Sequence, residues 1–146
     1  MVYLDSSSLL KLLWPEPESA AVRAGVAAED VVIVSSLAEL ESEVQLKAAW
    51  LAGRYRAARW RRFREKLAEF RETEPFRFHR LGAPVFDVAL RQHRAGGNTH
   101  CRTLDRLHLD AMEELSVSRL MTNDANQAAV ARAIGLKVLT PGVIFA

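Results

Sequence analysis

Hydrophobic and polar positions follow two different spacings along this chain. Short apolar or alternating runs are typical of strands, and we expect strands at residues 2–4, 31–34, 76–81, 118–122 and 136–139. Between these runs, apolar residues recur every three or four positions, which indicates helices at residues 6–13, 18–28, 35–53, 54–71, 84–94, 99–115 and 124–134. Regular alternation of strands and helices predicts a three-layer α/β/α sandwich with a parallel central sheet. At 146 residues, we expect a single domain over 1–146.

The predicted helix after the second strand carries three glutamates near its start. We expect its core stripe at Leu37, Leu40, Val44, Ala48 and Leu51. At about 100° per residue, Glu41 lies at the edge of that stripe, whereas Glu39 and Glu43 point to the opposite side. Glu39 can complete a capping box with Ser36, and Glu43 can pair with Lys47. Glu41 has no such local role, so its carboxylate requires a partner or a metal ion.

The predicted helix over 99–115 has one acidic residue at the margin of its apolar side. Asp105 lies about 20° from Met112, whereas Asp110 is expected to face away from the core. His108 falls inside the apolar stripe. We interpret it as a buried core histidine with satisfied hydrogen bonds and not as a metal ligand.

Four carboxylates are expected at one edge of the sheet. Asp5 and Asp124 follow strands, and Glu41 and Asp105 lie near the beginnings of helices. In a parallel sheet both kinds of position lie near the carboxyl ends of the strands, where ligands bind. Helix capping alone would also account for Asp5 and Asp124.

An acidic cluster of this kind favours a hard divalent cation. Oxygen ligands prefer Mg²⁺ or Mn²⁺, and the scattered Cys and His residues lack the spacing of a zinc site. A phosphate ester is the natural substrate for such a metal. The sequence has no P-loop, no dinucleotide-binding G-x-G-x-x-G and no G-x-S-x-G, which argues against those three classes.

Composition and charge add few constraints. The net charge is +2, the single Cys101 excludes an internal disulfide, and no apolar run could span a membrane, so we expect a cytoplasmic protein. Residues 54–71 form an arginine-rich amphipathic helix. Its cations can be a solvated face, or a surface that follows a phosphate backbone or a protein groove.

Four segments together resemble the PIN domain family, most closely the VapC-type toxins of bacterial toxin–antitoxin pairs. These segments span nearly the whole chain, and they are MVYLDSSSLLKLLWPEPES, SSLAELESEV, RTLDRLHLDAM and MTNDANQAAVARAIGLKVLTP. The resemblance implies a PIN-like parallel sheet between helices. It also implies a metal-dependent endoribonuclease with an RNA substrate, a homodimer, and inhibition by a cognate VapB-like antitoxin.

Carried over by position, the resemblance implies that Asp5, Glu41, Asp105 and Asp124 form the catalytic, Mg²⁺- or Mn²⁺-binding site. Ser6 matches the small hydroxyl residue after the first Asp, which holds that carboxylate or a metal-bound water. Nothing is implied for the basic helix over 54–71.

Other interpretations are open. A receiver domain would have an acidic pair after the first strand and a Lys after the last, whereas Ser6 and Thr140 stand there. A haloacid-dehalogenase-like phosphatase would have a second Asp at the position of Ser7. A PIN nuclease of RNA processing outside a toxin pair, and a non-catalytic PIN domain that binds RNA or protein, are further alternatives.

Overall fold

The computed structural model describes residues 1–95 and 100–145. In chain order, they form β1 (Val2–Leu4), α1 (Ser6–Leu13), α2 (Ser19–Ala27), β2 (Val32–Ser35), α3 (Ser36–Leu51), α4 (Ala57–Phe70), β3 (Phe76–His79), α5 (Pro84–Ala95), α6 (Thr103–Glu114), β4 (Arg119–Met121), α7 (Ala125–Ala133) and β5 (Lys137–Leu139). Every predicted strand and helix is present, with ends shifted by a few residues. The largest shift is in the helix predicted over 99–115, which begins at Thr103; residue 99 lies outside the described residues.

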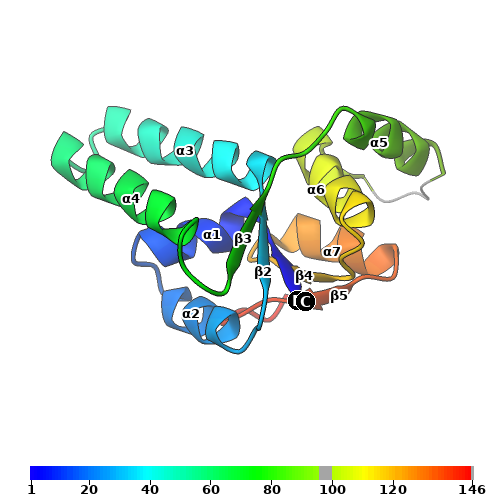
Figure 1. Cartoon of the computed structure of the whole chain (residues 1–146), viewed down its shortest axis with the longest axis horizontal. Coiled ribbons are helices and arrows are strands. Elements are labelled where there is room, and N and C mark those ends of the chain that lie inside the picture. The colour runs from blue at the N-terminus through cyan, green and yellow to red at the C-terminus, as the bar shows by residue number, and fades with distance from the viewer. Residues whose placement is uncertain (96–99, 146) are drawn as a thin grey trace.

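The five strands form one parallel sheet in the order β3-β2-β1-β4-β5 (Figure 1). All strands point the same way, so their carboxyl ends share one edge. β1 is the central strand, and Asp5 follows it directly. The predicted α/β architecture with a parallel central sheet is therefore confirmed.

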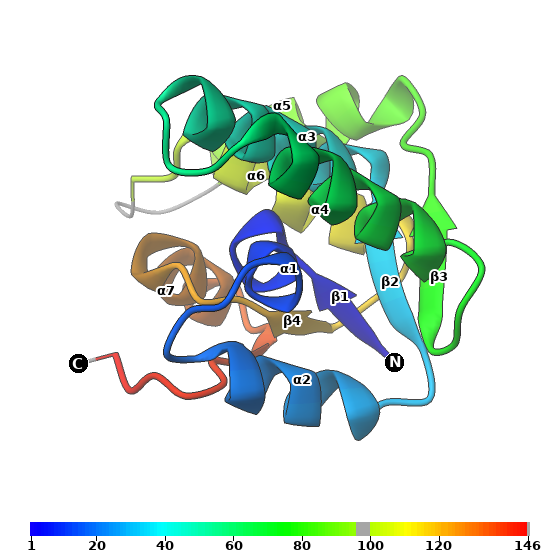
Figure 2. The same cartoon turned by 90° about the vertical axis from the view of Figure 1, so that its left-hand side faces the viewer.

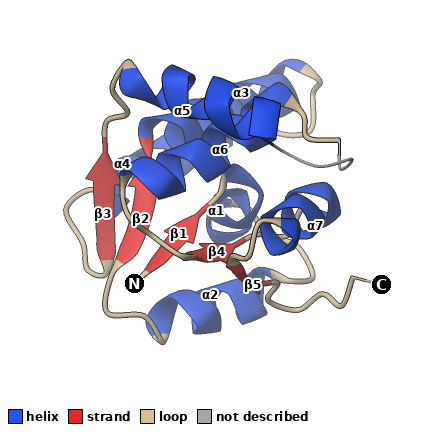
Figure 3. Cartoon of the chain, turned by 90° about the vertical axis from the view of Figure 1, so that its right-hand side faces the viewer, coloured by secondary structure: helices blue, strands red, loops and turns tan. Residues whose placement is uncertain are grey.

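Helices cover both faces of the sheet, and each face has its own core. Val2 and Leu4 pack with α1–α4 on one face, whereas Tyr3 packs with α5–α7 on the other (Figures 1 and 3). This alternation follows from the two-residue period of a strand. It explains why β1 is apolar at every position and has no solvent-exposed side. No helix in residues 1–95 and 100–145 is long and apolar enough to cross a membrane.

α3 and α4 form a hairpin that extends away from the sheet (Figures 1 and 2). Trp50 stacks on Trp60 near its tip, with ring centroids 4.3 Å apart. The expected core stripe of α3 is wrong: Leu40, Val44, Ala48 and Leu51 are exposed, and Leu37 is only partly buried. The buried positions are Ala38, Ser42, Leu46 and Ala49. Small side chains on this inner side let α3 approach its neighbours closely, so hydrophobicity alone did not identify it.

The glutamates of α3 also have different partners from those expected. Ser35, not Ser36, caps the helix by accepting a hydrogen bond from the Ala38 amide. Glu39 pairs with Arg71 and Glu43 with Arg64, both on α4. These pairs cross the hairpin, which sequence spacing within a single helix could not reveal.

Asp110 of α6 is fully buried, contrary to the expectation that it faces away from the core. α6 packs against α5 as well as the sheet-side core, so its second side is also covered. Neither carboxylate oxygen of Asp110 has a hydrogen-bond partner within the described residues. Burial raises the pKa of Asp110 to about 7, although Arg106 one turn earlier opposes the shift.

This raised pKa predicts a pH-dependent loss of stability. The folded protein keeps the Asp110 proton up to about pH 7, whereas the unfolded chain releases it near pH 4. The free energy of unfolding should therefore fall as the pH rises between these values. Asp110→Leu should remove this dependence and raise the free energy of unfolding at pH 8 by about 1–3 kcal/mol.

Urea unfolding at pH 5 and pH 8 measures the effect. Asp87→Leu, at an exposed position of α5, is the control and should change stability little at either pH. Equal destabilisation by Asp110→Leu at both pH values would contradict the prediction.

Candidate active site

A cavity of about 380 Å³ lies at the carboxyl edge of the sheet. Its lining includes all four predicted carboxylates and the predicted hydroxyl, namely Asp5, Glu41, Asp105, Asp124 and Ser6. Asp5 follows β1, Glu41 lies in the second turn of α3, Asp105 in the first turn of α6, Asp124 at the N-cap of α7, and Ser6 at the start of α1. The structure thus brings together residues up to 119 positions apart, 124 minus 5.

Asp5 is held from three sides. It caps α1 by accepting a hydrogen bond from the Ser8 amide at 3.1 Å, and the Ser7 hydroxyl donates to the same oxygen at 2.8 Å. The Thr122 hydroxyl donates to the second oxygen. Burial raises the pKa of Asp5, while His108 and these hydrogen bonds oppose the shift. The hydroxyls that contact Asp5 belong to Ser7 and Thr122, whereas Ser6 lines the cavity and helps to lower the pKa of Glu41.

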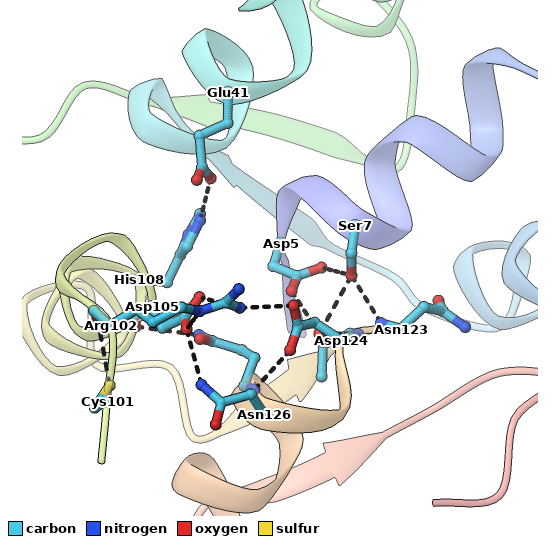
Figure 4. Close-up of polar contacts among 12 residues, drawn as sticks. Asp5, Ser7, Glu41, Cys101, Arg102, Asp105, His108, Asn123, Asp124 and Asn126 are labelled. Atoms are coloured by element: carbon cyan, nitrogen blue, oxygen red, sulfur yellow. Dashed lines mark hydrogen bonds and ion pairs between the residues drawn. The ribbon is translucent and has the colours of Figure 1, made fainter. Parts of the chain in front are cut away.

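Arg102 connects two of the carboxylates (Figure 4). Its Nε lies 2.5 Å and one Nη 3.2 Å from the two Asp105 oxygens, and the same Nη lies 2.8 Å from Asp124. Asp105 also accepts a hydrogen bond from the side-chain amide of Asn126, Nδ2, at 3.1 Å. The Arg102 side chain is about half exposed, so it can leave the cavity without breaking the core.

Asp124 combines a structural and a cavity-lining role. It caps α7 by accepting from the Gln127 amide at 3.0 Å. Burial alone would raise its pKa, but the Gln127 amide and Arg102 outweigh burial and lower it. Asp124 is therefore ionised at neutral pH.

Glu41 stands at the end of a row of hydrogen bonds that runs through His108 and Tyr3 to Ser35. Its carboxylate accepts from His108 Nε2 at 2.5 Å, His108 Nδ1 lies 2.8 Å from the Tyr3 hydroxyl, and that hydroxyl lies 2.6 Å from Ser35 Oγ. Burial would raise the pKa of Glu41, but His108 outweighs it and the pKa is lowered. Since an ionised carboxylate can only accept, the proton of this pair lies on His108 Nε2. His108 is buried and bonded at both nitrogens, as expected from the sequence.

Sequence reasoning missed the groups that hold the carboxylates in place. Arg102 could have been noticed because it precedes Asp105 by three positions, the spacing of a helical ion pair. No sequence pattern identified Thr122 and Asn126. Thr122 reaches the site because β4 pairs with β1, and Asn126 reaches it because α7 begins there.

The carboxylate oxygens of this cavity suit a hard cation, but they already form ion pairs and hydrogen bonds with other side chains of the protein. In residues 1–95 and 100–145, no three acidic, His or Cys side chains are arranged to hold a metal ion. Arg102 spans Asp105 and Asp124, and His108 holds Glu41. A metal fits the chemistry of this cavity only if Arg102 turns away from it.

Comparison with known proteins identifies the family. The PIN domain family model matches residues 2–145. A search of curated proteins finds no significant match.

Solved structures share the fold at low sequence identity. VapC20 of Mycobacterium tuberculosis, described as a Sarcin–Ricin loop cleaving toxin, superposes with a TM-score of 0.70 at 14% identity, over 93% of this chain and 96% of that chain. FitAcB from Neisseria gonorrhoeae superposes with a TM-score of 0.66 at 17% sequence identity, over 99% of this chain and 100% of that chain. FitAB bound to an IR36 DNA fragment superposes with a TM-score of 0.62 at 16% sequence identity, over 100% of this chain and 99% of that chain. The resemblance drawn from the sequence motifs is confirmed, and the chain belongs to the PIN domain family.

Proposed function

We propose that this protein is a metal-dependent endoribonuclease that hydrolyses phosphodiester bonds of RNA, and that it is the toxin of a VapBC-type pair. The observation that carries the proposal is the meeting of Asp5, Glu41, Asp105 and Asp124 in one cavity at the carboxyl edge of the sheet. Membership of the PIN domain family supports the same conclusion.

Mg²⁺ or Mn²⁺ is the proposed cofactor, held by Asp5, Glu41, Asp105 and Asp124. When bound, the ion would activate a water molecule and offset negative charge on the phosphodiester. The chain's own groups prepare this site. Ser7 and Thr122 fix the orientation of Asp5, and His108 fixes that of Glu41.

The toxin assignment is supported by the fold shared with VapC20, and a cognate antitoxin is the proposed partner because FitAB-type structures are also similar. We further propose that the protein forms a homodimer, as the resemblance to VapC-type toxins implies. A nuclease of RNA processing is the second candidate. A small neighbouring reading frame encoding a DNA-binding antitoxin would favour the toxin, and lack of cleavage would favour a non-catalytic domain.

The central experiment compares three glutamates of one helix. Glu41→Gln should abolish RNA cleavage while the fold persists, because Gln can still accept from His108 but lacks the charge that a hard cation requires. Glu39→Gln and Glu43→Gln should each retain cleavage and change stability by at most about 1 kcal/mol, because their partners on α4 are exposed.

Cleavage of tRNA, rRNA and mRNA is measured in Mg²⁺ and in EDTA, beside the melting temperature of each variant. Full cleavage by Glu41→Gln, or by the wild-type protein in EDTA, would refute the proposed mechanism.

A second prediction concerns the support of Glu41. His108→Leu should keep the core apolar but remove the donor to Glu41, lowering kcat by about 10–100-fold. His108→Gln, which retains an N–H donor, should recover part of this loss. Single-turnover cleavage and Mn²⁺ titration test both variants, and equal activity of the two would argue against a positioning role.

A third prediction concerns Arg102 as a competitor of the metal. Arg102→Gln should leave Asp105 and Asp124 mutually repelling, which lowers apo stability but tightens Mn²⁺ binding by about tenfold, or about 1.4 kcal/mol. Arg77→Gln removes an exposed ion pair with Glu74 outside the cavity and should not change metal affinity. Calorimetric titration with Mn²⁺ measures the effect. Weaker binding by Arg102→Gln would show that Arg102 supports the metal instead of competing with it.

A further inference from the structure

A row of cavities leads away from the carboxylate cavity along α3, past the C-cap of α1. Both helices begin at the carboxyl edge of the sheet and run toward the left in Figure 1. Gln45 of α3, one turn after Glu41, lines the carboxylate cavity and also the next cavity, of about 240 Å³. The floor of that second cavity consists of Ala48, Ala49 and Ala52. Small side chains therefore keep one side of α3 open along its length.

The row continues past the end of α1. Trp14 and Arg54 line the second cavity and also a third, of about 210 Å³, which Tyr55, Arg59 and Phe63 complete. We call this surface the α1–α3 groove, defined by Trp14, Gln45, Ala48, Ala52, Arg54 and Arg59. From Glu41 to Ala52 the helical rise gives it a length of about 16 Å.

Unpaired arginines gather at the far end of the groove. Arg54 and Arg59 have no carboxylate partner in the part of the chain that the structure describes, whereas Arg64 and Arg71 on the same hairpin are paired with glutamates. The Arg59 guanidinium lies over the Phe63 ring, 5.4 Å from its centroid, and both side chains line the third cavity and the neighbouring one that Arg56 and Arg62 also line. Glu16 also lines this end, and Lys11 pairs with both Glu16 and Glu18.

We infer that the α1–α3 groove binds single-stranded RNA and leads it to the carboxylate cavity. This inference rests on the proposed function, because the reacting phosphate must lie at the carboxylates while the rest of the strand extends away. Cationic side chains and the aromatic face of Trp14 suit phosphates and unstacked bases. Among the six residues that define the groove, Trp14 is the one large apolar side chain and two are arginines, so charge complementarity favours RNA over a peptide.

Neighbouring arginines of α4 provide a matched test. Arg59 lines the groove. Arg61, two residues later, does not line it and forms no ion pair within the described residues. Both are exposed, so Arg59→Gln and Arg61→Gln change the net charge equally. Each is combined with Asp5→Asn, which stops the proposed cleavage while Asn can still cap α1.

Binding of a fluorescein-labelled 12-nucleotide single-stranded RNA is measured by anisotropy in Mg²⁺ at several NaCl concentrations. Arg59→Gln should weaken binding about three- to tenfold and reduce the slope of log K against log[salt] by about 0.7. Arg54→Gln/Arg59→Gln should reduce the slope by about 1.4. Arg61→Gln should stay within about twofold of the parent protein.

The outcomes separate this inference from the proposed function. If the wild-type protein cleaves RNA but Arg59→Gln and Arg61→Gln bind it equally well, the groove is not an RNA path and is left to a protein partner. The inference is also overturned if the parent protein binds no RNA. If the wild-type protein cleaves no RNA, the proposed function fails, whatever the arginine variants bind.

Discussion

Burial of carboxylates is the constraint on which the rest of this structure depends. Desolvation raises the pKa of Asp5 and would raise those of Glu41 and Asp124 if nothing compensated it. The chain answers with a different device at each position. Asp5 accepts hydrogen bonds from hydroxyl and backbone amide groups. Glu41 accepts a hydrogen bond from His108, and Arg102 forms ion pairs with both Asp105 and Asp124. The fold can therefore form before any cation binds.

The topology places these devices where they are needed. β1 lies at the centre of the sheet, so its end is adjacent to the end of β4 and close to the starts of α3 and α6. The hydrogen bonds from Glu41 through His108 and Tyr3 to Ser35 link α3, α6, β1 and the end of β2. One buried network thereby ties a cavity residue to the cap of α3 and to the middle of β1. Movement of α6 would disturb Glu41 directly.

Much of this arrangement could be predicted from the sequence, because strands and helices have distinct apolar periods. The strand β1 and the acid that follows it came from local patterns, whereas Glu41 reaches the cavity although the core stripe used to orient it is exposed at Leu40, Val44 and Leu51. Long-range contacts could not be predicted in this way. The ion pairs of Glu39 and Glu43 depend on how α4 returns along α3, and the burial of Asp110 depends on how α5 covers α6. The inner side of α3 was misassigned because Ala38, Ser42 and Ala49 are chosen for small size, not hydrophobicity.

Separation of charge explains how an acidic cavity and a basic hairpin coexist in a chain of net charge +2. Arg54 and Arg59 lie beyond the end of α3, about 16 Å of helix from Glu41, whereas the screening length at physiological salt is about 8 Å. At that distance the arginines do not neutralise the carboxylates, which leaves this task to Arg102 and, in the proposed enzyme, to the metal. The carboxylates in turn do not hold the arginines, which are free to bind phosphate. The length of α3 thus separates the carboxylates, which would bind a cation, from the arginines, which would bind the substrate.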